Sequence, residues 1–204
     1  MRRREFEVTD PNELNGVLGA IEWGTLALIT PAGTPLQVPL NFVHLEGQLY
    51  FHGSPAGEKV ATLKQNSAAS FLVVDAHALL PSTFFDSENA CPATQFFKSV
   101  LVKGQVRLVQ DLGEKARALQ ALMTKLQPQG GYDPIASENP RYQAALRGVA
   151  VIAMSMASIS GKWKLGQNLS PELANGIMEK LEQRMAPEDC RTANAMEQYR
   201  PLGK

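Results

Sequence analysis

The chain has 204 residues, of which 44% are hydrophobic and 20% are charged, as is typical of a globular protein with one sizeable core. Its 20 basic and 20 acidic residues give a formal net charge of zero, which disfavours a nucleic-acid partner and an acidic disordered chain. No apolar run is long enough for a signal-peptide core or a membrane span. We therefore expect a cytoplasmic protein that has no membrane partner.

The sequence does not favour a metal site or a disulfide. Cys91 and Cys190 lie far apart in the chain, and the histidines His44, His52 and His77 are scattered. Neither set has the spacing of metal ligands. A disulfide between two distant cysteines is also unusual in a cytosolic protein.

The first 74 residues predict short strands joined by tight turns. Asp10 followed by Pro11 is typical of the start of a helix. We expect strands at 24–30, 36–44, 49–52 and 69–74, with a short helix at 58–65 before the last of them. Pro39 cannot donate to a strand ladder, so it indicates a sheet edge, a bulge or a place where a ligand lies on the backbone.

The second half predicts longer elements. Residues 75–95 are expected to form a loop, and 97–110 a long strand. Helices are expected at 112–127 and 138–146, and residues 148–159 are apolar enough to form a buried central strand. Ser170 and Pro171 predict the start of a helix that ends near Met185, and a second helix follows at about 187–199. About six strands without regular strand–helix alternation favour a small antiparallel barrel.

The connection between residues 49 and 74 is the best candidate for a ligand site. His52, Gly53, Ser54, Gly57 and Lys59 lie where a strand leads into a helix. Small residues allow close backbone approach, the start of a helix favours an anion, and a lysine adds positive charge. The alternative is a solvated connection with a charged tip.

Four motifs in this order resemble the FMN-binding split-barrel (pyridoxamine phosphate oxidase-like) superfamily, over roughly residues 10–168. The motifs are Val38-Pro39-Leu40-Asn41-Phe42; residues 49–54 with Gly57 and Lys59; residues 98–104 followed by Glu114, Lys115 and Leu119; and residues 160–168, SGKWKLGQN. The first three are most similar to the nitroimidazole-reductase (Nim) branch. The fourth is similar to the flavin-binding transcriptional-regulator (PaiB) branch.

The resemblance implies a mainly β fold with helices: a six-stranded antiparallel split β-barrel over residues 1–168, with peripheral helices. Residues 169–204 would then be a C-terminal helical pair packed on the barrel. It also implies a homodimer that binds FMN at the subunit interface and acts on a small-molecule substrate. The arginine-rich phosphate clamp and the C-terminal arginine and histidine pattern of true pyridoxamine phosphate oxidases are absent, which disfavours vitamin B6 oxidation.

The implied cofactor site draws on four segments of the chain. His52, Gly53, Ser54 and Lys59 would hold the phosphate and ribityl chain. Along the isoalloxazine would lie Val38, Pro39, Leu40 and Asn41, with Ser99 and Val100 added by the partner subunit. Lys162, Trp163, Gln167 and Asn168 would close the site from the C-terminal side.

Several of these residues have an alternative interpretation. Trp163 would stack near the flavin or cap the barrel core. Gln167 and Asn168 would contact flavin or substrate, or cap the following helix. In the expected 75–95 loop, Phe84 and Phe85 with His77 would form a substrate lid or an apolar dimer contact. Cys91 would lie near the mouth of the active site or be a plain loop cysteine.

The function that these features favour is an FMN-dependent oxidoreductase that reduces a small organic acceptor. The alternatives are a flavin-binding regulator or sensor without turnover, a haem-handling split barrel, and an interaction module that has lost its cofactor. The neutral charge and the absence of a basic helix weigh against direct DNA binding. No acid–base pair is required, because a flavin carries the redox chemistry itself.

Overall fold

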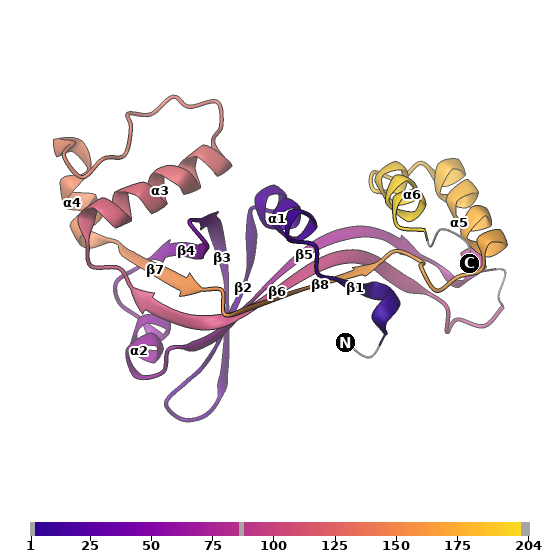
Figure 1. Cartoon of the computed structure of the whole chain (residues 1–204), viewed down its shortest axis with the longest axis horizontal. Coiled ribbons are helices and arrows are strands. Elements are labelled where there is room, and N and C mark those ends of the chain that lie inside the picture. The colour runs from indigo at the N-terminus through magenta and orange to yellow at the C-terminus, as the bar shows by residue number, and fades with distance from the viewer. Residues whose placement is uncertain (1–2, 86–87, 201–204) are drawn as a thin grey trace. The chain divides into compact units, whose positions relative to one another are not determined.

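The computed structural model describes residues 3–85 and 88–200, which fall into two compact units. Unit 1 comprises residues 1–13, 74–99 and 160–204, and unit 2 comprises residues 14–73 and 100–159. Strands β5 (Ala68–Leu80) and β6 (Thr94–Leu108) continue from one unit into the other (Figure 1).

Unit 2 holds a closed ring of six antiparallel strands, which confirms the predicted barrel. The strands run in the order β6-β5-β2-β3-β4-β7, and a pairing between β6 and β7 closes the ring. The other elements that lie in or begin in this unit are β2 (Trp23–Ile29), β3 (Pro35–Leu45), β4 (Gln48–Gly53), β7 (Ala150–Ser155), β8 (Ser158–Lys164), α2 (Glu58–Gln65), α3 (Leu112–Leu126) and α4 (Pro140–Gly148). Helix α1 (Pro11–Ala20) starts in unit 1 and continues into unit 2.

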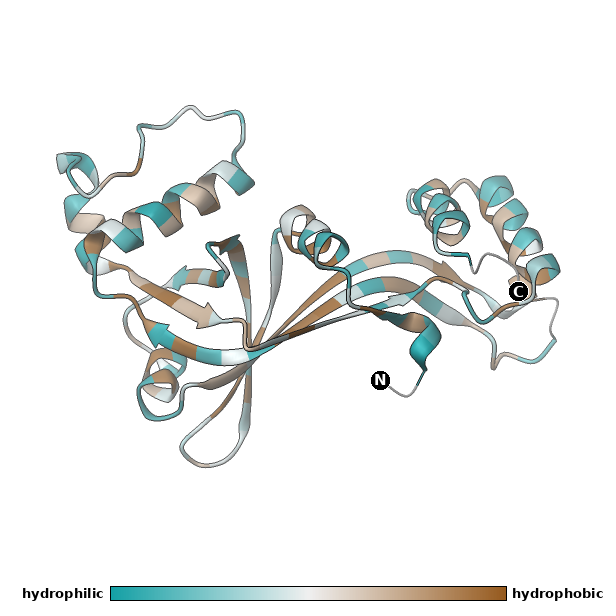
Figure 2. Ribbon diagram, viewed as in Figure 1, coloured by the Kyte–Doolittle hydropathy of each residue, from teal (hydrophilic) through white to brown (hydrophobic). Residues whose placement is uncertain are grey.

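An aromatic cluster fills the barrel of unit 2. Phe42, Phe51 and Phe71 are almost completely buried, and the ring of Phe71 lies 4.9 Å from that of Phe42 and 4.8 Å from that of Phe51. Edge-on and tilted pairs at this separation add to the stability gained by burying the rings. Strand β7 is buried over Ala150–Met154, as its apolar sequence predicts, and Figure 2 shows its hydrophobic colouring.

Unit 1 combines the remaining strand segments with the two C-terminal helices. Its elements are η1 (Arg4–Phe6), β1 (Glu7–Val8), the second half of β5, η2 (Ser82–Phe85), the first half of β6, most of β8, α5 (Pro171–Arg184) and α6 (Asp189–Gln198). Strand β1 pairs antiparallel with β8. Ser170 caps α5 by accepting a hydrogen bond from the Leu173 amide, as the sequence predicts.

The expected loop at 75–95 is largely wrong. Strand β5 extends to Leu80, η2 follows, and β6 already begins at Thr94, while residues 86 and 87 lie outside the described residues. Asp75 and His77 interrupt the apolar pattern and suggested a loop. His77 is nonetheless buried within β5, and the amide of its neighbour Ala78 donates to the Thr192 hydroxyl.

The expected single strand at 148–159 is two strands, and β1 was not expected, so the described residues hold eight strands where about six were expected. Strand β7 ends at Ser155, whose side-chain oxygen accepts a hydrogen bond from the Gln105 amide at 3.0 Å. This side-chain bond takes a donor that the ladder would otherwise use, and the chain turns before starting β8 at Ser158. The continuous apolar run concealed this break.

The helices confirm the predicted C-terminal pair. Ile177 and Leu181 of α5 are completely buried, and α6 contributes Ala193 and Met196 to the buried set of unit 1. The boundary expected at residue 168 stays a prediction. No helix described between residues 3 and 200 is long and apolar enough to cross a membrane.

Candidate functional site

The turn between β4 and α2 in unit 2 has a shape that its glycines make possible. Strand β4 ends at Gly53, and Gly57 precedes the first residue of α2 with a φ of 107° and a ψ of 172°. This conformation is essentially restricted to glycine. No side chain caps the helix, so the first amides of α2 point out of the turn without a side-chain acceptor.

Lys59 lies directly over the backbone of Gly53. A Cβ atom added to Gly53 would come 2.7 Å from the Lys59 Nζ and 3.8 Å from its Cε, and apart from its two chain neighbours it would meet no other described residue within 4 Å. Glycine at position 53 is therefore what lets the lysine ammonium approach the strand end. The two residues that the sequence placed in one site are indeed together.

The corner formed by His52, Gly53 and Lys59 is electrically positive, and within residues 3–85 and 88–200 no carboxylate is paired with it. Among the described residues, no hydrogen bond or ion pair joins the Lys59 ammonium to another group. Burial lowers the pKa of Lys59. Partial burial and then the charge of Lys59 lower the pKa of His52. An anion bound here would oppose both effects, because it stabilises the protonated forms.

Ser54 is positioned by the turn itself. Its side-chain oxygen accepts a hydrogen bond from the Ala56 amide at 3.2 Å. The hydroxyl hydrogen remains available as a donor. Lys59, Ser54 and the α2 amides therefore form a donor set that fits a phosphate group.

The predicted residues on β3 do not all share one face. In the register with β2, Val38 lies opposite Leu26 and Leu40 opposite Gly24, whereas Pro39 pairs with Thr25. Side chains alternate along a strand, so Val38 and Leu40 lie on the face that carries the buried Leu26. Pro39 and Asn41 lie on the other face, and the Asn41 amide donates to the Glu22 carbonyl at 3.2 Å.

Ser99 and Val100 are neighbours on β6 with different environments. Val100 is completely buried within its own chain. The Ser99 hydroxyl donates to the Lys162 carbonyl at 3.5 Å. Their predicted contribution to a partner's flavin stays a prediction.

The predicted residues of the 160–168 segment lie in unit 1, and two of them are used locally. Trp163 is completely buried, which favours the packing alternative for this side chain. Gln167 donates to the Trp163 carbonyl at 2.9 Å and accepts from the Leu165 amide at 2.8 Å, so it closes its own turn rather than capping the next helix. The Lys162 ammonium lies 5.4 Å from the centre of the Phe97 ring.

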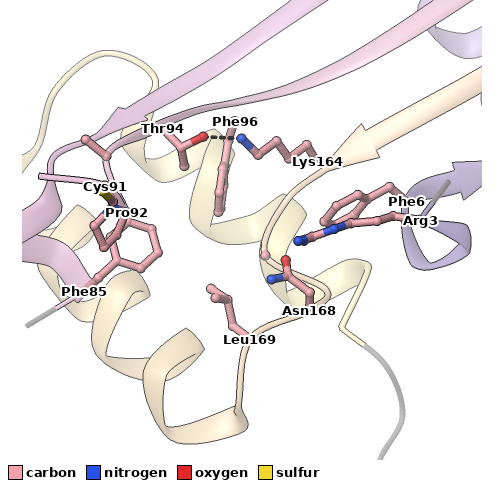
Figure 3. Close-up of a pocket in the computed structure, with 12 residues that line it drawn as sticks. Arg3, Phe6, Phe85, Cys91, Pro92, Thr94, Phe96, Lys164, Asn168 and Leu169 are labelled. Atoms are coloured by element: carbon pink, nitrogen blue, oxygen red, sulfur yellow. Dashed lines mark hydrogen bonds between the residues drawn. The ribbon is translucent and has the colours of Figure 1, made fainter. Parts of the chain in front are cut away.

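Asn168 lines a pocket of about 370 Å³ in unit 1 (Figure 3). The sequence analysis did not assign the arginine and the lysine that line this pocket, Arg3 and Lys164, to a site. Lys164 stood inside the fourth motif, and its alternation with Lys162 along β8 was the available signal. A second pocket of unit 1, of about 520 Å³, is lined by Asp75, His77 and Lys98, and sequence reasoning placed two of these in a loop.

The segments that the sequence assigned to one site are thus distributed over two units. Unit 2 brings together His52, Gly53, Ser54 and Lys59. Unit 1 holds the 162–168 segment. Their joint contact with a single flavin stays a prediction.

The chain resembles several solved structures. It matches a candidate 5-nitroimidazole antibiotic resistance protein from Bacteroides thetaiotaomicron with a TM-score of 0.61 and 22% identity, over 76% of this chain and 85% of that one. A flavocytochrome from Azotobacter vinelandii matches with a TM-score of 0.67 and 22% identity, over 81% and 72% of the two chains. An FAD- and heme-binding protein from Mycobacterium smegmatis matches with a TM-score of 0.64 and 18% identity, over 78% and 74%. Identities this low establish a shared fold alone.

Family membership comes from the sequence. No curated protein matches the chain. Residues 10–163, which include the whole barrel and the turn at Lys59, match the family described as pyridoxamine 5'-phosphate oxidase. The chain therefore belongs to the pyridoxamine 5'-phosphate oxidase family.

Proposed function

We propose that the protein is an FMN-binding flavoprotein that acts as an oxidoreductase on a small organic acceptor. One observation carries the proposal: the Lys59 ammonium is partly buried against Gly53 and has no anionic partner among the described residues. Partly burying a charge is unfavourable unless it is paired. A bound phosphate would provide the missing partner.

The chemistry of the turn favours a phosphomonoester over a neutral ligand. A phosphate carries about two negative charges and three acceptor oxygens near neutral pH. It would meet the Lys59 ammonium, the Ser54 hydroxyl and the uncapped amides of α2. FMN ends in such a group, whereas riboflavin does not. The turn therefore supports FMN as the form of flavin that is bound.

When bound, the flavin would supply the hydride or electron transfer, and the protein would supply orientation and a suitable environment. Val38 and Leu40 would offer apolar contacts, while Pro39 and Asn41 would serve the opposite face of the same strand. From unit 1, Lys162 and Asn168 would contribute the PaiB-like part of the site, while the buried Trp163 and the turn-closing Gln167 would hold that segment in place. The Nim branch remains the nearest proposed relative.

The outer face of the barrel supports a homodimer in which Ser99 and Val100 serve the partner's flavin. Trp23, Ile29 and Leu72 are 58%, 43% and 41% exposed. Thr25 of β2 pairs with both Leu72 and Pro39, and side chains directly opposite one another lie on the same face. A sheet face with an exposed tryptophan and leucine is an expected interaction surface, and we propose a second copy of the chain as its occupant.

Binding of FMN and of riboflavin by the wild-type protein and by Lys59→Ala tests the proposal. We expect FMN to bind and Lys59→Ala to weaken it about 10-fold to 100-fold, since a hydrogen bond to a charged group contributes about 1.5–3 kcal/mol. Riboflavin affinity should not change, because it lacks the phosphate. Lys64→Ala is the matched control, since Lys64 is an exposed lysine on the same helix.

The outcomes separate the alternatives. A folded wild-type protein that binds neither flavin would refute the proposal, and a Soret band in its spectrum would indicate haem instead. Equal losses of FMN affinity in Lys59→Ala and Lys64→Ala would refute the assignment of the phosphate site to Lys59. Flavin binding without reoxidation by any small acceptor would favour the regulator.

A further inference from the structure

The pocket that Asn168 lines in unit 1 has an apolar wall opposite a cationic one. Figure 3 shows Phe85 on one side, Phe96 above the centre, and Arg3 with Asn168 on the other side, where the Phe6 ring lies beside Arg3. Lys164 reaches across the upper side to the Thr94 hydroxyl. The side chains come from η1, η2, β6, β8 and the turn after β8, so the pocket is built by several elements of one unit.

The charged groups of this pocket have the same sign. Arg3 and Lys164 line it, and none of the described residues that line it carries a carboxylate. Burial, then the charge of Lys162 and then that of Arg3, lower the pKa of Lys164. Within residues 3–85 and 88–200, neither the Arg3 guanidinium nor the Asn168 amide has a hydrogen-bond or ion-pair partner. Two cations, a free amide and no counter-charge favour an anionic ligand.

The size and the rings narrow the choice of anion. A volume of about 370 Å³ is near the lower end of the roughly 300–1,000 Å³ range of small-molecule sites. Phe85 and Phe96 offer flat apolar surfaces suited to a single ring. An arginine guanidinium matches the two oxygens of a carboxylate.

We propose that this pocket binds a small aromatic carboxylate, with the ring against Phe85 and Phe96 and the carboxylate toward Lys164, Arg3 and Asn168. The proposal does not depend on flavin binding by the turn at Lys59. It assigns a ligand class to a part of the chain that the phosphate argument does not use.

Calorimetric titration of the full chain with benzoate, and with benzamide as its neutral counterpart, tests the proposal. Benzoate should bind once per chain and benzamide at least tenfold more weakly. Lys164→Gln should weaken benzoate about tenfold or more, because a charge-assisted bond is lost. Lys103→Gln is the matched control, since Lys103 is an exposed lysine of β6 outside the pocket. Thermal unfolding of each variant checks that the fold is kept.

Other outcomes would overturn the proposal. Equal binding of benzoate and benzamide would show that the protein does not prefer a carboxylate. Equal effects of Lys164→Gln and Lys103→Gln would show that benzoate does not bind in this pocket. Displacement of benzoate by inorganic phosphate with equal affinity would show an anion site without a role for the ring. Displacement by riboflavin would assign the pocket to the flavin. Failure of FMN to bind, with benzoate binding intact, would refute the proposed function alone.

Discussion

Gly53→Ala places a methyl group where the Lys59 ammonium lies. The added carbon would be 2.7 Å from Nζ, and among the described residues other than its chain neighbours it would also meet the Cε of the same lysine at 3.8 Å. Gly53 does not have a positive φ, so alanine fits the backbone without strain. The substitution therefore acts on the flexible end of one side chain and leaves the strand in place.

The expected magnitude follows from this contact. Non-bonded carbon and nitrogen atoms separate to about 3.5 Å, so Nζ must move by about 1 Å. A charge-assisted hydrogen bond is formed only at about 2.7–2.9 Å, and its loss costs about 1.5–3 kcal/mol. We expect FMN to bind about 10-fold to 100-fold more weakly. Stability should hold or rise by about 0.4–1 kcal/mol, because alanine restricts the unfolded chain.

Flavin-fluorescence titration with FMN and riboflavin, alongside urea unfolding, measures both effects. Gly16→Ala is the control, since a Cβ there meets nothing within 4 Å and it lies in helix α1. The control should gain stability and keep its FMN affinity. An unchanged FMN affinity in a folded Gly53→Ala protein would refute the role of this contact, and so would an equal loss of riboflavin.

Three further predictions concern stability. Asp189→Asn should lower the unfolding free energy at pH 7 by about 1.5–3 kcal/mol, because the buried carboxylate accepts from Arg184 at 2.8 Å. The Arg184 hydrogen bonds hold the Asp189 pKa below its ordinary value, so urea unfolding of wild type and variant should converge as the pH falls below about 4. Burial lowers the pKa of Lys125 to about 8 from 10.5. Between about pH 8 and 10.5 the unfolded state therefore binds more protons than the folded state. The unfolding free energy should rise with pH across this range in the wild type but not in Lys125→Met. Gly104→Ala would put a carbon 1.9 Å from the Ser155 backbone oxygen and should cost about 1–3 kcal/mol in thermal unfolding, whereas an unchanged midpoint would contradict this close packing.

The barrel could be predicted because its strands are short and separated by clear turns. Helix α2 begins and ends where its sequence predicts, at Glu58 and Gln65. The extension of β5 could not be predicted, because Asp75 and His77 are polar residues whose partners lie far away in the sequence. The Asp75 carboxylate is paired with Arg191 of α6, and the His77 ring lies 3.5 Å from the hydroxyl of Thr192 in the same helix. Only the tertiary fold brings α6 to this strand.

The candidate site was predictable where it is local in sequence. His52 to Lys59 run without interruption from the end of β4 to the first turn of α2, so residue types and spacing were enough to predict an anion site there. Asn41 shows the limit of motif reasoning, since strand alternation turns its side chain away from Val38 and Leu40. Arg3 was missed because, apart from Phe6, the other residues that line the pocket are more than 80 residues away in the chain.

The lysines of unit 2 show why burial alone does not identify a ligand site. Lys115 donates to the Leu146 and Val149 carbonyls at 2.9 and 2.8 Å, and Lys125 donates to the Leu18 and Phe42 carbonyls at 2.8 and 3.2 Å. Both ammonium groups exchange water for backbone oxygens and so join elements of the fold. Lys59 is also partly buried, but no described residue accepts its protons. Burial with a protein acceptor indicates a structural lysine, whereas burial without one leaves the charge to a ligand, and this difference is what singles out Lys59.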